Sequence, residues 1–138
     1  MIRFRESVNI RGSAEKVFMA VSDVGRIMEF WHGTRSLARE CDHYKIRFAF
    51  PSTGRVAFIS HPESKNFETE YLSGPIKGRK IETISQADGY IVLASEWDVN
   101  LTPFLRPFEA RIGEHFRSGT KSALDRIKIA CEEKMSDK

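Results

Sequence analysis

Apolar and polar residues alternate along the first ten positions of the chain. The apolar residues that share a parity with Glu6 are Ile2, Phe4, Val8 and Ile10. Because successive side chains of a strand point to opposite faces of a sheet, this pattern predicts a half-buried strand over residues 2–10. Gly12 breaks the alternation, and Ser13 follows in the position of a helix N-cap. We therefore expect a helix to begin immediately after the strand.

Two short apolar stripes follow, with a break between them at Ser22 and Asp23. The first stripe consists of Ala14, Val17, Phe18 and Val21. The second consists of Val24, Ile27, Met28 and Trp31. Spacings of three and four residues are typical of amphipathic helices, and Asp23 is suited to cap the second one. Helices this short are not stable alone, so we expect both to pack on an apolar surface, the face of a sheet.

The segment from about Arg35 to Leu101 predicts successive short strands separated by turns. Turn residues occur at 42–43, 51–54, 62–66, 73–75 and 88–89. The pair Asp88-Gly89 is the strongest hairpin signal, because Asp-Gly favours the tight turn that joins two antiparallel strands. Consecutive hairpins with one apolar and one polar face predict an antiparallel meander.

After Thr102 and Pro103 the pattern becomes that of a long helix, which we expect to reach about Glu133. Its apolar stripe, at spacings of three and four, consists of Phe108, Ile112, Phe116, Gly119, Ala123, Ile127 and Ala130. A glycine inside a helix costs about 1 kcal/mol relative to alanine. We interpret Gly119 as a position where the helix backbone approaches the sheet closely.

Composition narrows the class of protein. A length of 138 residues predicts a single domain over 1–138, and 41% hydrophobic with 30% charged residues is ordinary for a soluble globular protein. Lys and Arg number 22 against 19 Asp and Glu, and they are interleaved with the acids, so we expect no nucleic-acid partner. No apolar run approaches the ~18 residues that span a bilayer, so we expect no stable membrane insertion. The two cysteines, Cys41 and Cys131, lie far apart and no secretory signal is apparent, which predicts reduced thiols and a cytoplasmic location.

The order of these predicted elements resembles that of the START-like superfamily, also called the polyketide cyclase/dehydrase or SRPBCC group. The resemblance rests on the segments VNIRGSAEKVFMAVSDVGRIMEFW, YLSGPIKGR and FEARIGEHFRSGTKSALDRIK. It implies an α+β helix-grip fold, in which a curved antiparallel sheet of about seven strands wraps around the long C-terminal helix and leaves a cavity. It also implies that the two short helices close one end of the grip. Members bind lipids, sterols, quinones, polyketides or hormones, and others are cyclases, hydrolases or co-chaperones, so the fold does not fix the function.

Glu6 is the candidate acid of such a cavity. Strand parity places its carboxylate at the centre of an apolar face, where burial is costly unless the group is paired, hydrogen-bonded or protonated. Glu6 is then a catalytic acid or base, or a polar anchor for a ligand. Two structural alternatives remain, namely a local bulge that turns Glu6 outward and an arginine partner on a neighbouring strand.

The candidate ligand-binding residues are the large side chains that parity places on the inner face. On the strands these are Tyr44, Phe48, Phe58, Thr69, Tyr71, Ser95 and Trp97. The helix stripe adds Phe108, Ile112 and Phe116, and Trp31, beside His32, lies where the resemblance implies the cavity entrance. Aromatic residues with sparse polar groups are typical of a small-molecule pocket and equally of a packed core. The resemblance favours the pocket.

Established catalytic and metal-binding motifs are absent from the sequence. It contains no phosphate-binding glycine loop, no nucleophile elbow and no cysteine or histidine pairs at zinc spacing. The segment 40–43 gathers Glu, Cys, Asp and His, but these residues alternate across a strand end, which indicates an exposed turn. We expect neither a metal nor a cofactor.

Three functions remain open. The first is a non-catalytic carrier or sensor, a monomer or weak homodimer, that encloses a small apolar ligand. The second is an enzyme of the cyclase, dehydratase or hydrolase type, in which Glu6 acts with Tyr71 or His32 and two of these groups must reach one point in the cavity. The third is a module that binds a protein partner through its basic outer surface and sheet edge, as in the co-chaperones, and an exposed apolar patch would favour it.

Overall fold

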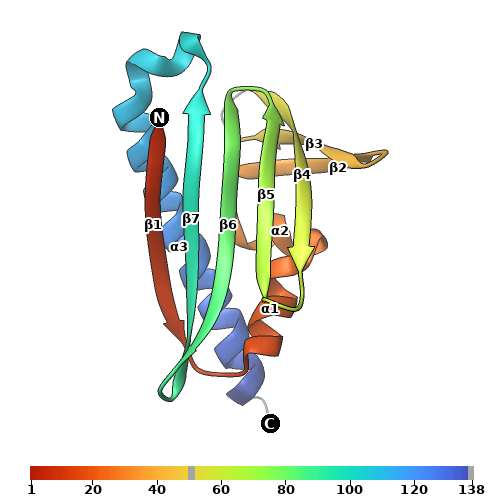
Figure 1. Cartoon of the computed structure of the whole chain (residues 1–138), viewed down its shortest axis with the longest axis vertical. Helices are drawn as coiled ribbons and strands as arrows, with labels where there is room; N and C mark the ends of the chain where they lie inside the picture. The colour runs from red at the N-terminus through yellow and green to blue at the C-terminus, as the bar shows by residue number, and fades with distance from the viewer. Residues whose placement is uncertain (50–51, 137–138) are drawn as a thin grey trace.

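The chain forms an α+β helix-grip fold, and the computed structural model describes residues 1–49 and 52–136 (Figure 1). Seven antiparallel strands form one sheet in the order β1-β7-β6-β5-β4-β3-β2. The strands are β1 (Ile2–Ile10), β2 (Thr34–Glu40), β3 (His43–Phe48), β4 (Thr53–His61), β5 (Asn66–Ser73), β6 (Ile76–Ala87) and β7 (Tyr90–Leu101). The helices are α1 (Ala14–Ser22), η1 (Val24–Arg26), α2 (Ile27–Phe30), η2 (Pro103–Phe108) and α3 (Glu109–Ser136).

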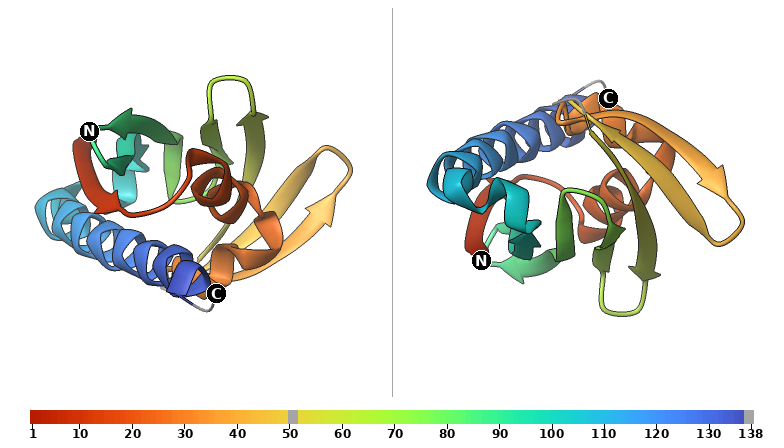
Figure 2. Two further views of the ribbon diagram at one scale, coloured as in Figure 1. Left: turned by 90° about the horizontal axis from the view of Figure 1, so that it is seen from below. Right: turned by 90° about the horizontal axis from the view of Figure 1, so that it is seen from above.

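The sheet curves around one side of α3, as the two end-on views show (Figure 2). Helix α3 lies along β1 and β7, while the β2–β3 hairpin projects away from the other end of the sheet (Figure 2).

Strands β6 and β7 approach closely at Gly78, where a Cβ atom would lie 2.2 Å from the carbonyl oxygen of Asp98. With a φ of +136°, this position of β6 needs a glycine, two residues before Lys80. The predicted fold class is confirmed.

The short helices begin where the sequence predicts. The Ser13 Oγ accepts a hydrogen bond from the backbone N–H of Lys16 at 3.1 Å and caps α1. Asp23 repeats this device, because its Oδ1 accepts from the backbone N–H of Gly25 at 2.9 Å and starts η1. The chain therefore ends α1 and starts η1 around a single residue, and the one-turn helix α2 follows from Ile27 without a side-chain cap.

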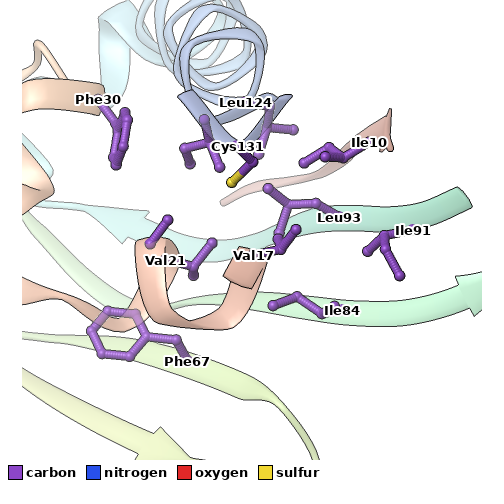
Figure 3. Close-up of a cluster of buried hydrophobic side chains, with 12 residues drawn as sticks. Ile10, Val17, Val21, Phe30, Phe67, Ile84, Ile91, Leu93, Leu124 and Cys131 are labelled. Atoms are coloured by element: carbon purple, nitrogen blue, oxygen red, sulfur yellow. The ribbon is translucent and has the colours of Figure 1, made fainter. Parts of the chain in front are cut away.

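Two groups of buried apolar residues form the interior. The α1-side cluster lies between α1, the sheet and the C-terminal half of α3, and includes Val17, Leu93 and Leu124 (Figure 3). The aromatic cluster lies farther along the sheet and includes Phe4, Tyr71 and Trp97, with Phe116 of α3 packed against it. Trp31 touches both clusters.

The structure corrects two predictions for the C-terminal region. Phe108, placed on the inward stripe, lies at the end of η2 and is 53% exposed, because the chain turns through a 3-10 helix before α3 begins. Gly119 does not mark a close approach to the sheet, since a Cβ atom there would meet nothing within 4 Å. The turn expected at 51–54 lies partly outside the described residues, and β4 begins at Thr53.

Replacing Gly119 by alanine is expected to raise the free energy of unfolding by about 1 kcal/mol. Gly119 lies inside α3 with open space at its Cβ position, so the gain in helix propensity meets no steric cost. Urea unfolding followed by circular dichroism measures the change. Gly78→Ala is the contrasting control and is expected to destabilise, because its Cβ would overlap the Asp98 carbonyl. A loss of stability in Gly119→Ala would show that the position is crowded.

Candidate functional site

A cavity of about 320 Å³ lies between the sheet, α3 and the segment that joins α2 to β2. Its inner wall is formed by Trp31, Phe48, Tyr71, Ile76, Lys80, Trp97, Phe116 and Thr120. All but Trp31 and Phe116 are buried. The cavity therefore extends from the aromatic cluster toward the surface.

Trp97 is the centre of the inner wall. Its ring stacks with Tyr71, Phe116 and Phe4 at centroid distances of 5.9, 5.1 and 5.7 Å. The ring of Trp31 is tilted against it at 6.4 Å. The indole Nε1 of Trp97 is buried and has no hydrogen-bond partner among the described residues.

The mouth of the cavity has two lips. One is a stripe along α3 at spacings of four, three and four residues, made of His115, Gly119, Ser122 and Arg126. The other is the segment 32–35 with the neighbouring Ala49. Arg126 of the first lip is bonded to the end of α2, just before the second lip, because its Nη1 donates a 2.9 Å hydrogen bond to the carbonyl oxygen of Phe30. Within the described part of the chain, no Asp or Glu side chain lines this cavity.

A buried polar group on β6 and β7 adjoins the aromatic wall. Lys80 is 6% exposed, and its Nζ lies 3.8 Å from Oε2 of Glu82, which is 2% exposed. The hydroxyl of Ser95, opposite Glu82 in the strand register, donates to the same carboxylate oxygen at 2.7 Å. The Lys80 Nζ also lies 3.3 Å from the centroid of the Trp31 ring and 5.4 Å from that of Trp97. Lys80 lines the cavity, whereas Glu82 and Ser95 lie behind it.

Burial shifts the ionisation of this group. It lowers the pKa of the Lys80 ammonium, although the neighbouring Glu82 opposes that shift. It raises the pKa of Glu82, opposed by Lys80 and by the Ser95 hydroxyl. Burial also raises the pKa of Tyr71, and the charge of Glu82 adds to the effect, so this side chain stays a phenol and a hydrogen-bond donor.

Glu6 faces inward as strand parity predicts, but it lies beside the cavity and is not part of its lining. Its carboxylate Oε2 is 3.3 Å from Nη1 of Arg117, and its side chain is 15% exposed. The pairing of Glu6 with Ser95 across β1 and β7 is regular, so no bulge turns it outward. The arginine partner comes from α3 and not from a neighbouring strand. The role of Glu6 as an acid or a ligand anchor stays a prediction.

The structure brings some of the candidate ligand-binding residues together and separates others. Those that line the cavity are Trp31, Phe48, Tyr71, Trp97 and Phe116. Tyr44 and Phe58 pack against each other at 5.1 Å, away from the lining, and Thr69 is buried. Ser95 holds Glu82, Ile112 packs against the aromatic cluster, and Phe108 is exposed. His32, expected near the entrance, is part of the mouth.

Lys80 and Glu82 are functional candidates that the sequence pattern does not predict. On β6 these residues alternate with Ile81 and Thr83, so each face of the segment carries both apolar and polar residues, and parity does not distinguish the inner face. The signal that could have revealed the pair is its spacing, because a lysine and a glutamate two positions apart in a strand lie on the same face and can interact.

The described residues contain neither a cluster of three His, Cys, Asp or Glu side chains placed to hold a metal ion nor a helix long and apolar enough to cross a membrane. In the segment 40–43, His43 Nδ1 lies 3.1 Å from Asp42 Oδ1, and His43 Nε2 lies 3.4 Å from Glu40 Oε1. These contacts make the segment a polar hairpin turn.

No protein-family model and no curated protein matches the sequence. Solved structures nevertheless share its fold. A conserved protein from Geobacillus kaustophilus has a TM-score of 0.78 at 12% identity, over 96% of this chain and 96% of its own. A START superfamily protein from Mycobacterium smegmatis has a TM-score of 0.65 at 15% identity, over 92% of this chain and 99% of its own.

An aromatase/cyclase from a Streptomyces species is a third structural neighbour, with a TM-score of 0.71 at 13% identity, over 96% of this chain and 94% of its own. Together these comparisons show the fold, a helix grip that this chain shares with a START superfamily protein and an aromatase/cyclase. Identities this low show the fold alone, and the chemistry of the site must be argued from its own residues.

Proposed function

We propose that this protein binds one small, predominantly apolar molecule in the cavity between the sheet and α3. The observation that carries the proposal is a volume of about 320 Å³ walled by five aromatic side chains. Ligand pockets are typically a few hundred Å³ and mostly apolar with a few polar groups. Each buried methylene contributes about 0.8 kcal/mol, so a guest with ten enclosed carbon atoms gains roughly 8 kcal/mol before the costs of association.

The polar groups of the lining indicate a guest that carries an oxygen acceptor. Lys80, which carries an amine, and Tyr71, which carries a phenol, both line the cavity. The buried indole N–H of Trp97 has no hydrogen-bond partner among the described residues. An acceptor on the guest satisfies donors that would otherwise lose hydrogen bonds when water leaves. A ketone, aldehyde, quinone or phenol on an aromatic frame fits this description.

Binding can be measured directly, because both tryptophans of the chain, Trp31 and Trp97, line the cavity. Titration with naphthalenemethanol is expected to change their fluorescence in a saturable way. In Gly119→Leu the new side chain enters the open space of the mouth and is expected to weaken binding about tenfold or more, since it displaces the guest. Ser118→Leu is the matched control, because Ser118 is exposed on the same helix and outside the lining.

Equal affinity in Gly119→Leu and Ser118→Leu would show that the cavity is not the binding site. Saturable binding that is lost only in Gly119→Leu supports the proposal. Native mass spectrometry of the purified protein then identifies the class of guest, since a co-purifying apolar mass is expected for a carrier.

A further inference from the structure

Lys80 is placed differently from an ordinary surface lysine. Its amine is buried in the cavity wall, next to the ring of Trp31, with the Glu82 carboxylate 3.8 Å away. Glu82 is not itself a lining residue, but its carboxylate, which accepts a hydrogen bond from the Ser95 hydroxyl, adjoins the amine nitrogen at which a carbinolamine would form. The arrangement combines a primary amine, an adjacent acid or base and an apolar chamber at one point.

We propose that Lys80 is a carbonyl-reactive amine that captures an aldehyde or ketone on an apolar guest as an imine, with Glu82 as its acid and base. The inference rests on the proposed function, because the guest must first enter the cavity. It adds a covalent step to simple binding and names the reacting group of the guest.

The step balances without any change of oxidation state. The nitrogen of Lys80 forms a bond to the carbonyl carbon as the carbonyl π bond breaks, and the oxygen takes a proton from Glu82 to become the hydroxyl of a carbinolamine. The nitrogen passes one of its two protons back to Glu82. Glu82 donates a proton to that hydroxyl, which leaves as water, while the nitrogen gives up a proton that returns to Glu82. The products are one imine and one water molecule.

The surroundings of Lys80 favour its uncharged amine, which is the nucleophile. Burial makes the ammonium less stable, and each unit by which the pKa falls raises the neutral fraction about tenfold at neutral pH. The proton that Lys80 releases can stay on Glu82, whose protonated form burial favours. The ring of Trp31 and the Glu82 charge stabilise the ammonium, so both forms of the pair are accessible.

The test uses naphthaldehyde with sodium cyanoborohydride, which reduces an imine to a stable amine. After reaction at neutral pH, intact mass spectrometry is expected to show one naphthylmethyl group per chain, and peptide mapping is expected to place it on Lys80. Lys80→Met and Lys80→Arg are expected to lower the labelling rate about tenfold or more, to the level of surface lysines. Lys77→Met is the matched control, because Lys77 lies exposed on the same strand.

A further variant tests the role of Glu82. The labelling rate of Lys80 is first divided by the cavity occupancy, which naphthalenemethanol fluorescence measures. In Glu82→Gln this ratio is expected to fall about tenfold or more, because the proton donor is lost. An unchanged ratio would overturn the assignment of Glu82.

The outcomes separate the two proposals. If naphthalenemethanol binds but naphthaldehyde labels all lysines equally or none, imine formation is overturned and the binding function stands. If neither compound interacts with the cavity, both proposals are wrong. Selective labelling of Lys80 that Gly119→Leu blocks supports both.

Discussion

Replacing Trp97 by alanine is expected to lower the free energy of unfolding by about 3–5 kcal/mol, the cost of removing a large buried aromatic side chain. The indole is 7% exposed and contacts Phe4 of β1, Tyr71 of β5 and Phe116 of α3. It therefore joins the sheet to α3 at the site of the cavity. Its removal enlarges that cavity, and the remaining rings lose their stacking partner.

Chemical unfolding of Trp97→Ala measures this effect, and the fluorescence of Trp31 remains as a probe. The control is Phe104→Ala, because Phe104 is 87% exposed and its removal is expected to change stability by less than about 0.5 kcal/mol. A loss below about 1 kcal/mol in Trp97→Ala would contradict the stacked arrangement at the centre of the wall.

The second large effect is expected from Glu82→Leu, which leaves Lys80 buried without its counter-ion. Removing one partner of a buried ion pair typically costs about 3–5 kcal/mol, and here the Ser95 hydroxyl also loses its acceptor. The double variant Lys80→Met with Glu82→Leu is expected to recover most of that loss, because no charge remains to be buried. A double variant as unstable as the single one would show that packing, and not charge, sets the cost.

The pH dependence of Glu82→Leu provides a second check on the same variant. Burial lowers the pKa of Lys80 below its unfolded value of 10.5, so between those two values the unfolded chain binds more protons than the folded chain. Stability then rises with pH through this interval. In the wild type Glu82 opposes this shift, so Glu82→Leu leaves the pKa of Lys80 lower still. The destabilisation that it causes is therefore expected to shrink as the pH approaches 10.5, and urea unfolding of both proteins at several alkaline pH values measures it.

The elements of this fold are predictable because each has a local signal. The alternation around Phe4, the caps Ser13 and Asp23 and the stripe through Phe116 all depend on residues close in sequence. The order of the elements then indicates the helix grip. Phe108 was misplaced because the stripe spacing continues through η2 although the chain there is not an α-helix.

The candidate site is less predictable, because a cavity depends on which inward side chains fail to fill the interior. Trp31 and Tyr71 are in its lining, whereas Tyr44 and Phe58 have the same character and pack on each other. Nothing in the local sequence separates these pairs. Lys80 was missed because the two faces of β6 carry similar residues, and only the register with β7 decides which one faces inward.

The two interior clusters have a consequence for how this molecule can change. Within the described residues, no buried member of the α1-side cluster lines the cavity. Substitutions that change the shape of the mouth at Gly119 or the polarity of the lining at Thr120 are therefore expected to leave the packing of the α1-side cluster unchanged. Exchanges at the exposed mouth are thus separated from half of the buried interior, whereas an exchange at Trp97 changes the cavity and the stability of the fold together.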